Sequence, residues 1–419
     1  MQYKKIKCQD YNIHLIKNNR FHAINFNVIF TQNVNKELIT YQNLLTNILT
    51  YSTEKDNTNM KLLRKCQELY SLRPTAFSTR YGNLYATNFG ISILNPKYLK
   101  DVSIKDNILL LKEVILNPLV KDNAFDEKLL DFIKEEEHAY VLSAREDTRS
   151  YSNIRLLELM GEDNYTLTGY SNLDVLKKVN AHNLFKQYQE MLAKSKIDFF
   201  ISGDFKNEEE IIDLIKENFI FPREKFKLNN PYTYHEKRKQ KYCLFNEKIS
   251  YLQSKISLGF KFYDLTEYEN KYVIGALNIL IGGDNNAYLM KKVREEKSLC
   301  YYIGSFASKL DNILIINSGI KKDNKDEVIK IIKEIFKEIE NGLFTEKELN
   351  NVKIELTNYV LNMEDSNNNL IQYYYGIEVF NADTIQRKKE IIKRITKEDI
   401  MNLAKKINLD TVFWLEGDL

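Results

Sequence analysis

The chain has 419 residues, of which 43% are hydrophobic and 28% are charged, a balance typical of a folded, soluble protein rather than a disordered one. Its 61 Lys and Arg residues against 58 Asp and Glu residues give a formal net charge of only +3, so we expect no nucleic-acid partner. The longest apolar stretch, residues 272–283, is too short to span a membrane, and the first 19 residues hold no apolar run of signal-peptide length. The four scattered cysteines do not suggest a disulfide framework. We therefore expect a cytoplasmic protein with no membrane partner.

A helix–strand unit closes the first half of the chain and returns at its end. Residues 179–205 combine a polar cap, an amphipathic helix, a short loop and the apolar strand IDFFISGD. Residues 395–419 repeat that order, with Thr396 and Asp399 as an N-cap pair and TVFWLEGD as the strand. A repeat of roughly 200 residues predicts two similar domains.

The segment between the two halves has the composition of an extended linker. Residues 221–242 contain two prolines, an Asn-Asn pair and a basic run. A strand with partial alternation follows at 251–262, and isoleucines and a valine fall on one helix face from 328 to 339. Thr345 and Glu348 predict a capping box for the next helix. We predict one domain at 1–220, a linker at 221–245 and a second domain at 246–419, each a sheet covered by helices.

The usual signatures of catalysis are absent from the sequence. None of the five histidines lies three or four residues from another, so no helix presents a paired-imidazole zinc face. His138 follows Glu135–Glu137, a run that a solvated helix face explains. Cys300 has no histidine near it in sequence and fits a small buried strand residue.

One stretch, IGGDNNAYLMKKVREEKSLCYY at 281–302, joins a glycine turn, a helix, a charged turn and a strand. Arg294 ends the helix, and Tyr301 opens the strand seven residues later. Locally, Arg294 is explained as a cation favoured by the helix dipole and Tyr301 as a packing aromatic.

This stretch nevertheless resembles the second domain of the M16 (pitrilysin/insulinase) metallopeptidases. The matching positions are Gly282, Gly283, Leu289, Val293, Arg294, Glu295, Leu299 and Tyr301. The resemblance covers the whole chain and implies an α+β fold, with two similar domains of mostly antiparallel sheet covered by helices that face each other as a clam-shell. It also implies that Arg294 and Tyr301 are catalytic: they reach the zinc site of an opposing domain, hold the substrate carbonyl and stabilise the oxyanion.

The zinc motif of that family, H-x-x-E-H, is lost in this chain. When Leu49 and Thr53 are aligned with the positions that follow the motif, Asn43, Thr46 and Asn47 stand where His, Glu and His would be. An amide is a poor zinc ligand, and threonine is no general base at neutral pH. The family's third ligand would lie near Glu135–Glu137, and one carboxylate cannot hold zinc alone. We therefore expect no metal in this chain.

The segment 66–94 matches the family stretch in which an edge strand pairs with the substrate backbone. Thr75, Ala76, Phe77 and Ser78 stand at that edge, which implies a peptide-binding role by strand addition. An ordinary hairpin explains the same residues equally well.

These features predict a zinc-less subunit, inactive alone, that forms a heterodimer with a zinc-motif M16 subunit and acts with it on peptides. The zinc would then be in the partner. Two alternatives stay open: a catalytically inactive scaffold or peptide-binding protein, and a self-sufficient zinc peptidase with unusual ligands.

Overall fold

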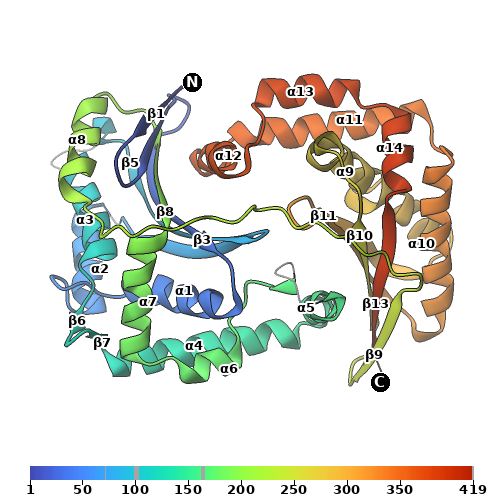
Figure 1. Cartoon of the computed structure of the whole chain (residues 1–419), viewed down its shortest axis with the longest axis horizontal. Coiled ribbons are helices and arrows are strands. Elements are labelled where there is room, and N and C mark those ends of the chain that lie inside the picture. Colours follow the sequence, from blue (N-terminus) through green and yellow to red (C-terminus); the bar gives the residue numbers. More distant parts are fainter. Residues whose placement is uncertain (71, 99–102, 162–165, 418–419) are drawn as a thin grey trace. The chain divides into compact units, whose positions relative to one another are not determined.

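The computed structural model describes residues 1–70, 72–98, 103–161 and 166–417. They form two compact units, each built around its own sheet (Figure 1). Unit 1 comprises Met1–Leu142, Gly169–Asn230 and Met363–Ala382, and unit 2 comprises Ser143–Thr168, Pro231–Asn362 and Asp383–Leu419. Each unit therefore takes one segment from the opposite half of the chain. The domain boundaries proposed from the sequence, at 1–220 and 246–419, concern the two halves and stay a prediction.

The sheet of unit 1 has six strands. Their order is β1 (Gln2–Lys7), β2 (Asn12–Lys17), β8 (Lys196–Gly203), β3 (Ala23–Asn33), β5 (Leu84–Leu94) and β4 (Thr75–Tyr81). Only β2 and β8 run parallel, and the other neighbours are antiparallel. A short hairpin pairs β6 (Val120–Lys121) with β7 (Ala124–Phe125). The sheet places β4 at an edge.

Helices cover one face of this sheet and enclose the core of unit 1. They are α1 (Lys36–Leu49), α2 (Asn59–Glu68), α3 (Ile104–Leu116), α4 (Glu127–Glu146), α6 (Leu173–Lys178), α7 (Ala181–Lys194) and α8 (Glu208–Asn218). Alternate residues of β3, from Ile24 to Phe30, are buried against them. The helix and strand expected within 179–205 are confirmed as α7 and β8.

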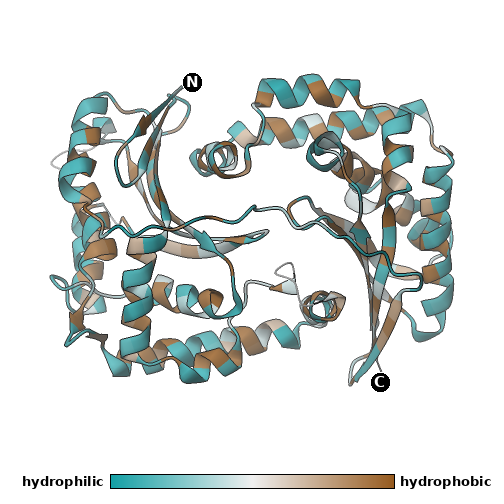
Figure 2. Ribbon diagram, viewed as in Figure 1, coloured by the Kyte–Doolittle hydropathy of each residue, from teal (hydrophilic) through white to brown (hydrophobic). Residues whose placement is uncertain are grey.

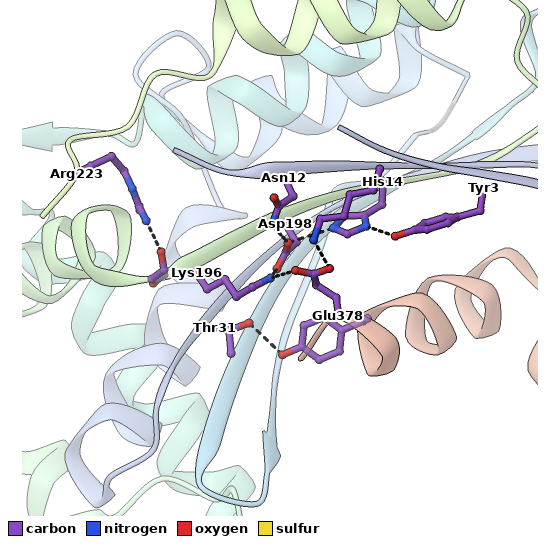
Figure 3. Close-up of polar contacts among 11 residues, drawn as sticks. Tyr3, Asn12, His14, Thr31, Lys196, Asp198, Arg223 and Glu378 are labelled. Atoms are coloured by element: carbon purple, nitrogen blue, oxygen red, sulfur yellow. Dashed lines mark hydrogen bonds and ion pairs between the residues drawn. The ribbon is translucent and has the colours of Figure 1, made fainter. Parts of the chain in front are cut away.

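The other face of the sheet carries α12 (Asn367–Phe380), which comes from the second half of the sequence. This face is polar although it is buried. Asp198 on β8 accepts hydrogen bonds from Asn12 and His14, and Lys196 bridges Asp198 to Glu378 of α12 (Figure 3). The ionic network therefore adds to aromatic contacts, such as that of Tyr375 with Phe200, in holding α12 on the sheet.

The sheet of unit 2 repeats the topology of unit 1. Its order is β11 (Cys300–Ser308), β12 (Ile313–Ile320), β10 (Ser254–Phe262), β13 (Ile407–Gly417) and β9 (Cys243–Ile249). These five correspond to β4, β5, β3, β8 and β2, and again only the last pair, β13 and β9, is parallel. The predicted class, α+β with two similar domains of mostly antiparallel sheet covered by helices, is confirmed.

Helices again cover both faces of the unit 2 sheet. One face packs against a continuous helix made of a π-turn (Glu269–Val273), α9 (Ile274–Asn278) and a second π-turn (Ile279–Gly283). The same face is covered by α10 (Lys325–Glu340), α11 (Glu346–Leu361), α13 (Ile385–Arg394) and α14 (Lys397–Ala404). Figure 2 shows α10 hydrophilic on its outward turns, as the predicted amphipathic pattern requires. The capping boxes at Thr345 and Thr396 are both present. The opposite face carries α5 (Thr148–Met160), from the first half of the chain.

Candidate functional site

Arg294 stands at the end of the π-helical turn Met290–Glu295 in unit 2. Val293 is buried, which anchors the turn, and Arg294 is exposed. The helix stops at Ser298, whose backbone is left-handed (φ 53°), with its N–H donating to the Arg294 carbonyl at 3.1 Å. The chain then enters β11 directly.

Tyr301 occupies a β-bulge at the start of that edge strand. Cys300 pairs with Ile320 and Tyr302 pairs with Gly319, so Tyr301 has no opposite residue on β12. Its side chain is 67% exposed. Within the described residues, neither Tyr301 nor Arg294 has a side-chain hydrogen bond or an ion pair. A cation and a phenol are thus left available on one end of unit 2.

The residues that the resemblance aligns with the zinc motif lie on α1 in unit 1, and Asn43 is held by several neutral groups. Its amide donates to the Ser171 hydroxyl and to the Gly169 carbonyl, both at 3.1 Å. Thr46 and Asn47 turn back to the helix backbone, and both donate to the Asn43 carbonyl, at 2.7 and 3.1 Å. These three side chains are satisfied without any ion.

Among the residues that the structure describes, Glu137 of α4 is the carboxylate that contacts Asn43. It is buried, and its Oε1 lies 3.5 Å from Asn43 Nδ2. Glu135, Glu136 and His138 are exposed, so the interpretation of this run as a solvated face is correct for them and wrong for Glu137. The physical reason is that only Glu137 lies on the face of α4 turned toward α1.

The donor set at this site does not fit zinc. Zinc in proteins takes three or four ligands from histidine, cysteine and carboxylates, and here one carboxylate stands among amides and hydroxyls. Across the described ranges, no group of three or more His, Cys, Asp and Glu side chains could hold a metal ion.

Tyr85 on β5 belongs to this site, and sequence reasoning missed it. Its hydroxyl donates to Asn43 Oδ1 at 2.8 Å. Burial, and then the charge of Glu137, raise the pKa of Tyr85, so the phenol stays a neutral donor. In the sequence, Tyr85 could be related to the proposed peptide-binding strand only by its position ten residues after Thr75. Its contact with α1 depends on the pairing of β4 with β5, which the sequence does not show.

The four residues proposed for peptide binding begin β4, at the edge of the unit 1 sheet. Thr75 is bonded to the neighbouring β5 through its hydroxyl, which donates to the Gly90 carbonyl at 3.2 Å. Ser78 contacts the Thr87 hydroxyl at 3.1 Å, and Phe77 is 45% exposed. The other side of β4 has no strand partner in the part of the sheet that the structure describes.

The chain is similar in sequence and in structure to several known proteins. Residues 178–356 match the family described as the peptidase M16 inactive domain. A Bacillus subtilis protein named "Probable inactive metalloprotease YmfF" is 26% identical, over 96% of this chain and 95% of its own length. Residues 178–356 therefore resemble the peptidase M16 inactive domain, and the whole chain resembles a protein named as a probable inactive metalloprotease.

Other proteins that resemble this chain include a second relative and several solved structures. "Uncharacterized zinc protease YmxG" of Bacillus subtilis is 26% identical over 40% of this chain and 39% of its own length. A conserved protein from Enterococcus faecalis shares the fold with a TM-score of 0.91, 25% identity and 99% coverage of both chains. The peptidase M16 inactive domain from Pseudomonas fluorescens aligns with a TM-score of 0.77 and 14% identity, over 100% of this chain and 99% of its own.

Proposed function

We propose that this chain is the zinc-less subunit of a heterodimeric M16 zinc peptidase and that it supplies Arg294 and Tyr301 to the partner's zinc site. The observation that carries the proposal is a contrast between two sites. The lost zinc motif around Asn43 is filled by internal hydrogen bonds, whereas Arg294 and Tyr301 are exposed and have no such bonds within the described residues.

The chemistry of the two side chains suits charge that develops on an oxygen. The partner would supply zinc to activate water and polarise the scissile carbonyl. Arg294 would bring a fixed positive charge and Tyr301 a neutral hydroxyl donor, and both types of group stabilise an oxyanion. Removal of one such donor typically lowers the rate by about 10²–10³-fold.

The substrate of the pair would be a peptide bound in extended form. The free edge of β4, with Thr75, Ala76, Phe77 and Ser78, could accept main-chain hydrogen bonds from it, while the exposed Phe77 ring offers an apolar contact. The four cysteines are unpaired, which fits the cytoplasmic location that we propose. No helix among the described residues is long and apolar enough to cross a membrane.

A scaffold or peptide-binding protein without any part in catalysis is the second candidate. The self-contained network at Asn43 favours it, because that network rigidifies the site without preparing it for chemistry. In this case the exposed β4 edge would bind peptide, and Arg294 and Tyr301 would not affect any turnover.

Co-purification from the native organism, followed by reconstitution, separates these functions. We expect a zinc-containing M16 partner and peptide cleavage by the pair but not by either chain alone. Arg294→Ala and Tyr301→Phe should each lower turnover strongly, with unchanged elution of the complex on size-exclusion chromatography. Normal cleavage by both variants would refute the proposal.

A further inference from the structure

We propose that Arg149, on the helix that unit 2 takes from the first half of the chain, is a positioning residue for Tyr301. It acts through the ring of Tyr302. This inference rests on the proposed function of Tyr301 and identifies what holds that side chain in place.

The bulge at Tyr301 changes the face of the sheet on which the next side chain of β11 lies. Cys300 packs against the main core of unit 2, the side of Ile320. Tyr302, two residues later, would face the same way in a regular strand. It lies instead on the opposite face, over Gly319 and within reach of Lys255, both on the side of α5. With Tyr302 on the α5 face and Cys300 on the core face, β11 must contain the bulge. The bulge in turn sets the direction of the Tyr301 side chain.

Gly319 provides the room that the Tyr302 ring needs. A Cβ atom at residue 319 would lie 2.7 Å from Cε1 of Tyr302 and 2.7 Å from Oε1 of Gln253. Part of the ring thus occupies the space that a side chain at position 319 would fill. Lys255, paired with Gly319 on the neighbouring β10, places its Nζ 5.3 Å from the ring centroid.

Arg149 completes the enclosure of this ring from α5. Its guanidinium carbon lies 4.9 Å from the Tyr302 ring centroid, a cation–π distance. Within the described residues this guanidinium has no ion pair. Arg149 is also the second residue of α5, where the helix dipole disfavours a positive charge. A cation at that position is best explained by the contact that it makes with Tyr302.

Other groups around Tyr302 do not replace this contact. Asp147 is engaged as the N-cap of α5, because its carboxylate accepts from the Ser150 N–H at 2.9 Å. The Lys255 ammonium also donates to the Gln253 side chain, so it is shared between two partners. Loss of Arg149 would leave one cation at the ring and would let Tyr302 turn away from Gly319.

The test uses a fluorine label at the residue to be positioned. Difluorotyrosine is introduced at position 301 of the full chain, and its ¹⁹F resonance is recorded in the wild type and in Arg149→Ala. We expect one resonance in the wild type, and a shifted, broadened or second resonance in Arg149→Ala. Arg149→Lys keeps the cation and should restore the original resonance.

Arg155→Ala is the matched control on the same helix. Arg155 binds Glu247 at 2.8 Å and also Glu158, so it fixes α5 to β9 without touching Tyr302. If Arg149 merely helped to dock α5, Arg155→Ala would change the Tyr301 resonance as well. We expect no change.

Turnover by the reconstituted pair, measured with a library of internally quenched peptides, provides the functional reading. Arg149→Ala should lower kcat by about 2-fold to 5-fold, the range expected for loss of one partly exposed cation–π contact, with little change in KM. An unchanged ¹⁹F resonance in Arg149→Ala would overturn the inference even if Tyr301→Phe abolishes turnover. A changed resonance with normal turnover in both Tyr301→Phe and Arg294→Ala would uphold the positioning of Tyr301 and refute the proposed function instead.

Discussion

The buried ion network that holds α12 on unit 1 provides a quantitative prediction for the substitution Asp198→Asn. The Asp198 side chain is fully buried and accepts from Asn12 at 2.8 Å and from His14 at 3.1 Å. Lys196 bonds to it directly and is also 3.0 Å from Glu378. An asparagine keeps the shape but removes the charge to which three donors point. A hydrogen bond to a charged group contributes about 1.5–3 kcal/mol, and removal of one partner of a buried pair costs about 3–5 kcal/mol, so we expect a local loss of about 2–4 kcal/mol.

Hydrogen exchange measured by mass spectrometry reports this loss where it occurs. Peptides that cover β8 and α12 should exchange roughly 30-fold to 900-fold faster in Asp198→Asn, which corresponds to that loss of free energy. Asp204→Asn is the control, because Asp204 also pairs with a lysine, Lys97, at 2.6 Å but at the surface. A surface pair contributes less than about 1 kcal/mol, so this variant should stay close to the wild type. Equal exchange in the two variants would refute the argument that burial makes the network important.

The pH dependence of the same variant follows from the pKa of Asp198. Burial by itself would raise this pKa, but the hydrogen bond from His14 and the charge of Lys196 outweigh it and hold the pKa below its usual value. A carboxylate with a lowered pKa stabilises the fold above its unfolded pKa of about 3.9, and this contribution is lost as the pH falls through the folded value. The difference between wild type and Asp198→Asn should therefore be constant near neutral pH and shrink in acid.

Three further outcomes are expected. Replacement of Asn43, Thr46 and Asn47 by His, Glu and His, beside the buried carboxylate of α4, should allow the chain to bind one zinc ion, as measured by metal analysis after dialysis; no uptake would contradict the register of the lost motif. Tyr85→Phe should lower the stability of unit 1 by about 1–3 kcal/mol in urea unfolding, because it leaves the Asn43 oxygen without its donor. Burial, with a neighbouring lysine, lowers the pKa of Lys309 from 10.5 to about 8, so the unfolded chain binds an extra proton between these values and stability should rise with pH there. Lys309→Met should lack that rise in its unfolding midpoint.

The duplicated fold could be predicted from the sequence because its signals are local. A capped amphipathic helix followed by an apolar strand occurs at the end of each half, and the structure places β8 and β13 at corresponding positions of two similar sheets. The positions of α5 and α12 could not be predicted in this way. An amphipathic pattern shows that a helix has a face to bury but not which sheet will bury it. The face that α12 buries holds Leu370, Ile371 and three tyrosines beside Asn367, a pattern that does not say which sheet it covers.

The same distinction holds for the candidate functional residues: local features could be predicted, and contacts between distant residues could not. The spacing of Arg294 and Tyr301 could be read directly, because a helix end, a turn and a bulge lie within eight residues. Asp198, by contrast, is a single charge inside an apolar strand, and its partner His14 is 184 residues away in the chain. Tyr85 reaches Asn43 only through strand pairing. Interactions of this kind depend on topology, which single-sequence patterns do not contain.

The surroundings of Asn43 and of Tyr301 differ in a way that bears on function. At Asn43, amide, hydroxyl and carbonyl groups bond to one another, and the Glu137 carboxylate lies beside them. At Tyr301 the backbone departs from regular pairing, and a ring, a glycine and two cations hold that departure in place. Bulges are common at sheet edges and beside active sites. An exposed phenol at such a bulge suits a contact with a group outside this chain, which is the reason that we favour a paired peptidase over a simple scaffold.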